Sequence, residues 1–341
     1  MKLLSLLVLI LICNVAVAST VEEYIKEGIQ FHDRGEYEQA ATKYKMALEL
    51  EPNNSLALYE LTLSYMYSRQ NEACIETAKR GLELDSKLNN EFIASLGSCY
   101  SQNGNMVEAI SAFEDGLKTN PNNSKLHLNI AVTLSNIRKD KKAIYHLKEA
   151  IKHSHNYASP YYFIAEMYRT TNYVIPAISF YMQFVLLEPN STRSQDASKK
   201  IIYLLNQGLK KKDNGGMDII VNSNSPKDDG NYTKYELALS IAAAGSMNEE
   251  NGSLKPEEKR YTDALTSFIT ICSEMAGEGI TSTFTWNYAL KNMTTLQAQG
   301  VYNTFAYILV SRAGIQGAVG WLAEHENEIK KMSTVIKTLD L

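Results

Sequence analysis

Small and large apolar residues recur along the first half of the chain with a period of about 34 residues. Aligning Ala40, Cys74, Ala109, Ala143 and Ala177 gives successive spacings of 34, 35, 34 and 34 residues. Around each of these positions the apolar residues follow a helical periodicity and are interrupted by short polar turns. Because one helical hairpin cannot bury its own apolar face, the pattern predicts five stacked hairpins over residues 21–190.

Each recurring type of residue in the period has a physical role. A small residue such as Gly28 lets two antiparallel helices approach closely, while Phe31 and Tyr44 are large enough to fill the space between hairpins. Gly35 falls in the predicted turn, where a left-handed backbone costs glycine little. Pro52 is expected to end the second helix of the first repeat. Repeats two and four depart from the pattern at several positions but keep the helical periodicity.

This pattern resembles the tetratricopeptide repeat, a 34-residue helix–turn–helix with a small–x–x–Tyr step followed by Ala, an aromatic residue, Ala and Pro. The first repeat contains Gly28, Phe31, Gly35, Tyr37, Ala40, Tyr44, Ala47 and Pro52, and the fifth contains Ala165, Tyr168, Ala177, Tyr181 and Pro189. The resemblance implies an all-α fold, a right-handed superhelix of hairpins followed by a helical C-terminal region. It also implies that the partner is another protein or a peptide segment.

Three further segments follow the repeats. Residues 191–210 carry a one-sided apolar patch, so they are expected to form a helix that caps the last hairpin. Residues 211–231 are polar and turn-forming, which predicts a linker, although the Met217–Val221 run is able to pair as a strand. Residues 232–341 return to helical patterning without the 34-residue register, and they either extend the superhelix or form a separate bundle. Helices are predicted there at 233–244, 256–276, 286–299, 301–313 and 316–338.

The first 18 residues have the pattern of a secretory signal peptide. Lys2 precedes an apolar run from Leu3 to Cys13, and Ala16-Val17-Ala18 offers small residues for cleavage after Ala18. The rival interpretation is an uncleaved membrane anchor. With cleavage, the chain is expected to be exported, periplasmic or secreted, and to have no transmembrane segment. The helical tail is also loosely similar to tails of exported tetratricopeptide proteins of Bacteroidota-type bacteria.

Charge and motifs limit the chemistry that the chain is expected to perform. The formal net charge of -4 argues against a nucleic-acid partner, which would select a basic surface. No Gly-x-Ser-x-Gly elbow or Walker phosphate loop occurs, and the His153/His155 pair falls in a turn, where solvation is the more common state. We therefore expect no catalytic residue, no metal and no cofactor. Cys74 and Cys99 take small, buried positions of the repeat, and a disulfide between them is conceivable.

The resemblance also selects candidate binding residues. In this family the first helix of each repeat lines a concave groove through its second, fifth, ninth, twelfth and thirteenth positions. The candidates at these positions are Ile25, Ile29, Tyr59, Leu63, Met66, Tyr67, Leu128, Val132, Tyr162, Glu166 and Arg169. Ile25 and Ile29 stand where chaperone-type members place the polar residues that clamp a carboxylate, so an extended or helical apolar segment is the expected ligand. Alternatively, the Tyr59–Tyr67 cluster packs within the protein.

Three hypotheses of function follow. The first is an exported scaffold that binds an apolar or aromatic segment of a partner protein in its groove and organises an envelope complex. The second is that the C-terminal helical region carries a ligand-binding or enzymatic activity that the repeats present. The third is a structural protein that associates with itself.

Overall fold

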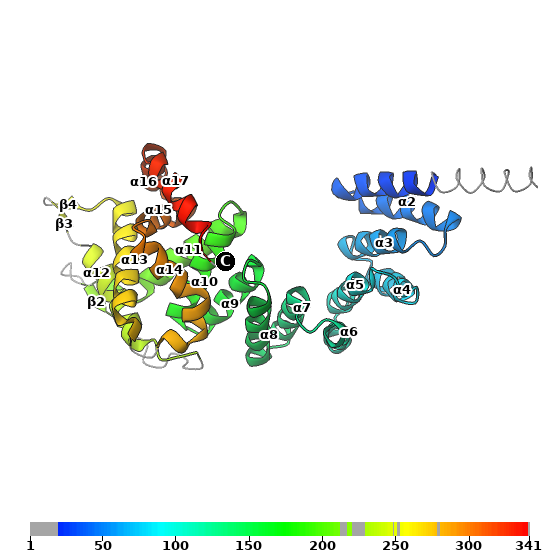
Figure 1. Ribbon diagram of the computed structural model, residues 1–341, viewed down its shortest axis with the longest axis horizontal. Coiled ribbons are helices and arrows are strands. Elements are labelled where there is room, and N and C mark those ends of the chain that lie inside the picture. The colour runs from blue at the N-terminus through cyan, green and yellow to red at the C-terminus, as the bar shows by residue number, and fades with distance from the viewer. Residues whose placement is uncertain are drawn as a thin grey trace, which may run out of the picture. The chain divides into compact units, whose positions relative to one another are not determined.

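The computed structural model describes residues 20–211, 217–219, 229–247, 249–250, 253–277 and 280–339. The predicted signal peptide and most of the predicted linker lie outside the described residues. The fold is all-α, as predicted: consecutive helical hairpins are followed by further helices (Figure 1). The chain divides into two compact units, Met1–His146 and Leu147–Leu341, which are described separately.

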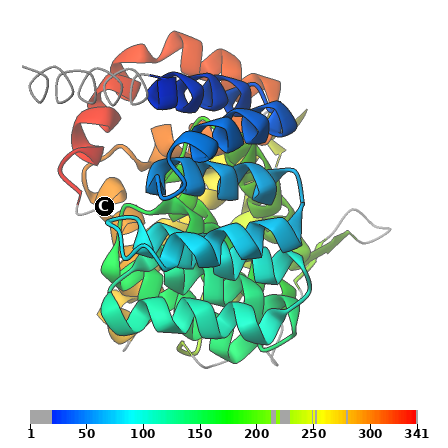
Figure 2. The same cartoon turned by 90° about the vertical axis from the view of Figure 1, so that its right-hand side faces the viewer.

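Helical hairpins stacked in layers make up the first unit (Figure 2). A helix covers residues 20–33 among the described residues. It is followed by α2 (Tyr37–Leu50), α3 (Ser55–Tyr67), α4 (Asn71–Leu82), α5 (Asn89–Gln102), α6 (Met106–Thr119), α7 (Ser124–Asn136) and the start of α8 (Asp140–His153). Asn54 and Asn123 cap α3 and α7 by accepting hydrogen bonds from backbone N–H groups of the first turn. The asparagine-rich turns therefore begin the first helix of the next repeat.

The turn inside each hairpin shows that all five repeats share one register. Each of these turns contains one residue in the left-handed backbone region. The five residues and their φ angles are Gly35 (77°), Arg69 (58°), Gly104 (85°), Arg138 (57°) and Asn172 (56°). They follow one another at the same 34, 35, 34 and 34 residue spacings as the small positions. The less regular repeats two and four thus adopt the same turn although arginine takes the place of glycine there.

Helices approach one another closely at Gly28 and Gly97, which confirms the predicted role of the small residues in the repeat. A Cβ added to Gly28 would lie 2.4 Å from a ring carbon of Tyr44, and one added to Gly97 would lie 2.4 Å from a ring carbon of Phe113. Both rings are fully or almost fully buried. The aromatic residue of the second helix therefore packs directly on the glycine of the first.

The second unit is built around α10 (Val174–Leu187), a helix that is buried on every side. Residues Ile175 to Leu186 are all buried, because α9 (Ala158–Thr170), α11 (Thr192–Gln207) and the C-terminal helices pack around them. A helix without a polar face is stable only when it is enclosed in this way. The fifth hairpin is therefore the core of the second unit.

The remaining helices of this unit are α12 (Thr233–Ser246), α13 (Glu257–Glu274), η1 (Met275–Gly277), η2 (Ile280–Ser282), η3 (Trp286–Leu290), α14 (Lys291–Ala298), α15 (Tyr302–Arg312), α16 (Gln316–Glu324) and α17 (Glu326–Ile336). Of these, η3, α14 and α12 contact α10, while α12 and α15 contact α11. The capping helix thus packs on α10 with one side and on C-terminal helices with another. Among the described residues, no helix is both long enough and apolar enough to cross a membrane.

Two details differ from the sequence expectation or refine it. The helix predicted at 316–338 is divided at His325, whose backbone leaves the helical region and whose Nδ1 lies 2.8 Å from the carbonyl oxygen of Trp321. The strand expected near Met217 is present: β2 (Met217–Ile219) pairs with β1 (Leu209–Lys211) in an antiparallel ladder. A second short ladder joins β3 (Glu249–Glu250) and β4 (Ser253–Leu254).

Candidate functional site

The candidate binding residues of the first unit differ in how much surface they offer. Ile29 is 36% exposed and Tyr67 is 55% exposed, while Tyr59, Leu63, Met66 and Val132 are half-buried. Ile25 and Leu128 are buried in the core, because neighbouring helices pack closely over them. Leu56, at the second position of α3, is also exposed. We define the inner face as Ile29, His32, Leu56, Tyr59, Leu63, Met66 and Tyr67.

Three aromatic rings meet at one end of the inner face. Tyr37 and Tyr67 are stacked with centroids 5.5 Å apart and an interplanar angle of 18°. His32 meets Tyr67 edge-on at 5.3 Å and Tyr37 edge-on at 5.0 Å. These residues, the aromatic cluster, come from the helix at 20–33, α2 and α3. Burial lowers the pKa of His32, against the opposing pull of Asp33, so its ring is neutral near pH 7. Its Nδ1 lies 3.0 Å from the Ser64 hydroxyl.

Carboxyl groups lie beside this cluster. Burial and then the charge of Asp33 raise the pKa of Glu60, while the Tyr44 hydroxyl opposes them. Burial and then Glu60 and Glu91 raise the pKa of Tyr59, with a contribution from Tyr67. The half-buried Tyr59 also packs edge-on against Phe92 with centroids 5.8 Å apart. The inner face thus combines apolar and aromatic side chains with an acidic border, which we define as Asp33 and Glu60.

The candidate residues of the fifth repeat lie in a closed polar network in the second unit. The Tyr162 hydroxyl donates to Asp196 at 2.6 Å, and Lys200 bonds Asp196 at 2.6 Å as well as Glu166. Arg169 donates to Glu166 at 2.9 Å. Burial acts against the charge of Lys200, but hydrogen bonds to Asp196, Glu166 and Tyr162 outweigh it and raise the pKa of Lys200. Glu166 therefore forms ion pairs with Lys200 and Arg169, and Asp196 forms one with Lys200.

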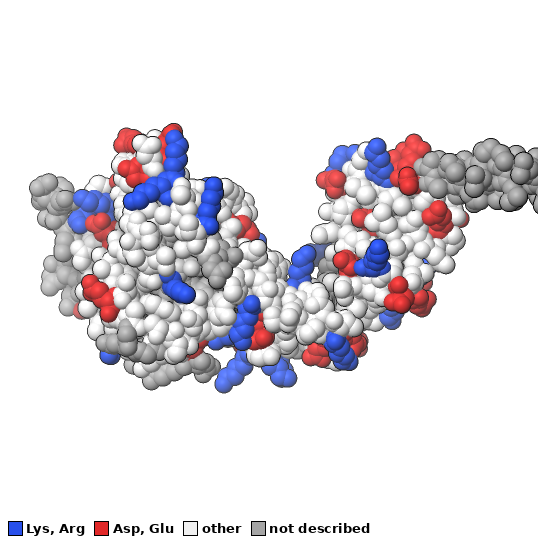
Figure 3. All heavy atoms as spheres, viewed as in Figure 1, with Lys and Arg blue, Asp and Glu red and all other residues white. Residues whose placement is uncertain are grey.

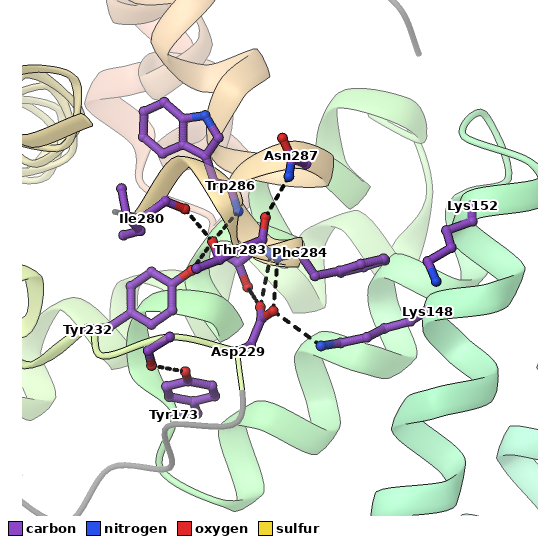
Figure 4. A network of polar contacts seen from close by, with 12 residues as sticks. Lys148, Lys152, Tyr173, Asp229, Tyr232, Ile280, Thr283, Phe284, Trp286 and Asn287 are labelled. Atoms are coloured by element: carbon purple, nitrogen blue, oxygen red, sulfur yellow. Dashed lines mark hydrogen bonds and ion pairs between the residues drawn. The ribbon is translucent and has the colours of Figure 1, made fainter. Parts of the chain in front are cut away.

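A second buried network begins at Asp229, a residue that the sequence assigns to the linker (Figure 4). Asp229 is only 6% exposed. Its carboxylate accepts hydrogen bonds from the backbone N–H groups of Phe284 and Thr285 at 2.9 Å each, and lies 3.2 Å from Lys148 Nζ. The first N–H groups of a helix have no partner within the helix. Asp229 therefore caps the helical stretch that begins at Phe284 and runs into η3, although it lies in a distant part of the sequence. We regard this network as a structural tie within the second unit.

Histidines and cysteines also form pairs. Nδ1 of His127 lies 3.0 Å from Nδ1 of His146, a pair that the sequence spacing does not indicate. Within the part of the chain that the structure describes, no group of three or more His, Cys, Asp or Glu residues is placed to hold a metal ion. Cys74 and Cys99 form a disulfide that joins α4 to α5, while Cys272 is buried and unpaired.

On the face drawn in Figure 3, acidic and basic side chains are interspersed and form no large patch of a single sign.

Family models match two parts of the first unit. A model described as TPR repeat matches residues 28–66, and a model described as tetratricopeptide repeat matches residues 91–123. The chain carries tetratricopeptide repeats. The small glutamine-rich tetratricopeptide repeat-containing protein 2 of Mycosarcoma maydis is 25% identical over 112 residues. That alignment spans 33% of this chain and 32% of the relative, so the chain matches about a third of the relative's length.

Solved structures that share part of this fold match it with TM-scores below 0.5. The pilF protein of Pseudomonas aeruginosa is 19% identical with a TM-score of 0.47, and the match covers 56% of this chain and 86% of that one. A thermophilic TPR protein of Thermus thermophilus is 20% identical with a TM-score of 0.46, covering 54% of this chain and 98% of that one.

Proposed function

We propose that the chain is an exported protein–protein interaction scaffold, and that the inner face of its first two repeats binds an apolar or aromatic segment of a partner protein. The observation that carries this proposal is the exposure of Ile29, Leu56 and Tyr67 along one face of consecutive hairpins. Tyrosine supplies a large contact area with a polar end and is enriched in protein interfaces. In this proposal the scaffold organises a complex of the cell envelope in a Bacteroidota-type bacterium.

The disulfide supports the proposed export. Cys74 and Cys99 are bonded, and disulfides persist mainly in oxidising compartments such as the periplasm or the extracellular space. This argument is independent of the signal-peptide pattern at residues 1–18. It favours a location outside the cytoplasm, where the proposed cleavage after Ala18 would release the protein.

Comparing two equally exposed tyrosines of the first unit tests the proposal. Tyr67 is 55% exposed on the inner face, and Tyr145 is 58% exposed on α8. We expect a partner that crosslinks to the native chain in its own cells to be lost with Tyr67→Ala and kept with Tyr145→Ala. Both variants must fold, which circular dichroism checks. If the two variants crosslink equally to the partner, the inner face is not the binding site.

A depression in the second unit favours the second hypothesis, a ligand site in the C-terminal region. It lies between α12 and α13, has a volume of about 420 Å³, and is lined by residues that include Ile241, Lys255, Asp263, Thr266 and Ile271. Its size suits a small organic molecule. A small-molecule library screened by thermal shift tests this reading. A compound that stabilises the native chain but not a Ser267→Trp variant, which fills the depression, would support it.

A further inference from the structure

The depression between α12 and α13 has an apolar side that is open to solvent. Ile241, Ala242 and Ile271 form this side. Ile241 is 51% exposed, and a Cβ added to Gly245, which also lines the depression, would meet no atom within 4 Å. Covering these residues with the apolar part of a ligand would remove apolar surface from water, which favours binding.

The same depression also holds one ion pair. Lys255 Nζ lies 2.8 Å from Oδ2 of Asp263, and both side chains are partly exposed. Among the described residues that line the depression, Lys255 and Asp263 are the only ionisable ones. This described lining is therefore neutral in total charge but offers both a cation and an anion.

The ion pair leaves hydrogen-bonding groups for a ligand. An ammonium group has three donors and a carboxylate has two accepting oxygens, and the contact between Lys255 and Asp263 uses one of each. A ligand with a single charge would be attracted by one partner and repelled by the other, because the two groups are adjacent. A ligand with both charges would instead form charge-assisted hydrogen bonds to both groups.

Resting on the second hypothesis, a ligand site in this depression, we propose that the ligand is a free α-amino acid with an apolar side chain. Its carboxylate bonds Lys255, its ammonium group bonds Asp263, and its side chain contacts Ile241 and Ile271. The volume of about 420 Å³ lies in the range of small-molecule sites. The ligand is thus small, zwitterionic at neutral pH and apolar at one end.

Calorimetric titration of the purified full chain tests the inference. The probes are valine, leucine, isoleucine, methionine and phenylalanine. The amino acid that binds most tightly is then compared with the amine and the carboxylic acid that share its side chain, each of which keeps one charge only. We expect at least one amino acid to bind, and both of its analogues to bind about tenfold more weakly, because each lacks one set of charge-assisted hydrogen bonds. Lys255→Met is expected to weaken binding of the amino acid by a similar factor.

Two exposed glycines offer matched variants that test the location. A Cβ added to Gly245 or to Gly320 would meet no atom within 4 Å, and Gly320 lies on α16 and is not part of the lining. We expect Gly245→Trp to abolish binding of the amino acid, because the indole fills the depression, and Gly320→Trp to leave it unchanged. Thermal unfolding checks that both variants fold.

Other outcomes separate the ligand from the site. If the amine or the acid binds as tightly as the amino acid and Gly245→Trp abolishes that binding, the inference is wrong and the ligand site stands. Unchanged affinity in Lys255→Met, or no binding by any of the five amino acids, would also overturn the inference. If an amino acid binds equally to Gly245→Trp and Gly320→Trp, the depression is not the site, and both the inference and the second hypothesis as placed here are wrong.

Discussion

The first and fifth repeats have the same fold but differ in how their second helices are buried. In the first repeat the second helix, α2, buries one side only, and apolar and aromatic residues such as Ile29 and Tyr37 keep part of their surface accessible. In the fifth repeat α10 is enclosed on all sides, and the residues equivalent to the inner face are tied into the Lys200 network. Equivalent positions are thus half-buried in both units, but those of the fifth repeat are tied into hydrogen bonds and ion pairs within the unit. Under the proposed function, this difference is the reason for assigning partner binding to the first unit.

The largest expected effect comes from removing a core ring in each unit. Phe180 is fully buried in α10 and lies near the rings of Tyr161, Tyr168 and Phe284. We expect Phe180→Ala to destabilise the second unit by about 3–5 kcal/mol, because it removes buried apolar contacts and leaves a cavity. Phe113→Ala is expected to do the same to the first unit. Urea unfolding followed by hydrogen exchange distinguishes them, and identical exchange patterns would show that the two units do not unfold separately.

Next in size is the disulfide of the first unit. Cys74 and Cys99 enclose a loop with a sequence separation of 25 residues. We expect the Cys74→Ala, Cys99→Ala variant to lose about 3 kcal/mol, because the unfolded chain regains conformational freedom. Thermal unfolding with and without reductant measures the loss. A reductant effect that persists in the double alanine variant would mean that the disulfide is not its source.

A smaller effect is expected at Asp229, in the second unit. Asp229→Ala leaves the N–H groups of Phe284 and Thr285 without their acceptor and removes the partner of Lys148. We expect a loss of about 2 kcal/mol, confined to the second unit. Asp229→Asn keeps one acceptor oxygen and is expected to lose less. Unchanged exchange rates at Phe284 and Thr285 in the alanine variant would argue against the cap.

The smallest effect concerns Glu60 and its dependence on pH. The folded protein raises the pKa of this carboxyl above 4.5, so the stability that the protonated group supports is present at low pH and is lost as pH rises through the folded pKa. Glutamine does not ionise, and we expect Glu60→Gln to melt slightly higher than the native chain at about pH 7.5 and at the same temperature at about pH 4. A variant that is less stable at neutral pH would show that the ionised carboxylate is a favourable contact.

The sequence predicts most of the fold, because the repeat carries strong local signals. The alanine and glycine spacing correctly locates the hairpins and the turns, even where Arg69 and Arg138 take the left-handed position. The C-terminal helices are also located closely, since their apolar periodicity and glycines are clear. The sequence does not predict that the last helix is divided into α16 and α17 at His325, because no glycine or proline lies at that position.

The packing of the second unit is harder to read from the sequence. The stretch Val174–Leu187 is apolar nearly all round, which is a signal of a helix enclosed on every side. The Lys200 network also has a signal: Lys200 lies 34 residues after Glu166, and Asp196 lies 34 residues after Tyr162. Extending the repeat register by one step places these pairs side by side. Asp229 has no such signal, because the N–H groups that it accepts from lie 55 and 56 residues away in sequence.

Hydrogen exchange on the complex tests the central claim most directly. The native chain is measured alone and with the partner segment that it captures. We predict that binding slows exchange in residues 20–33 and in α3, and leaves α9 and α11 unchanged. Slower exchange confined to α9, α11 or the helices that follow would contradict the claim that the first unit is the binding unit.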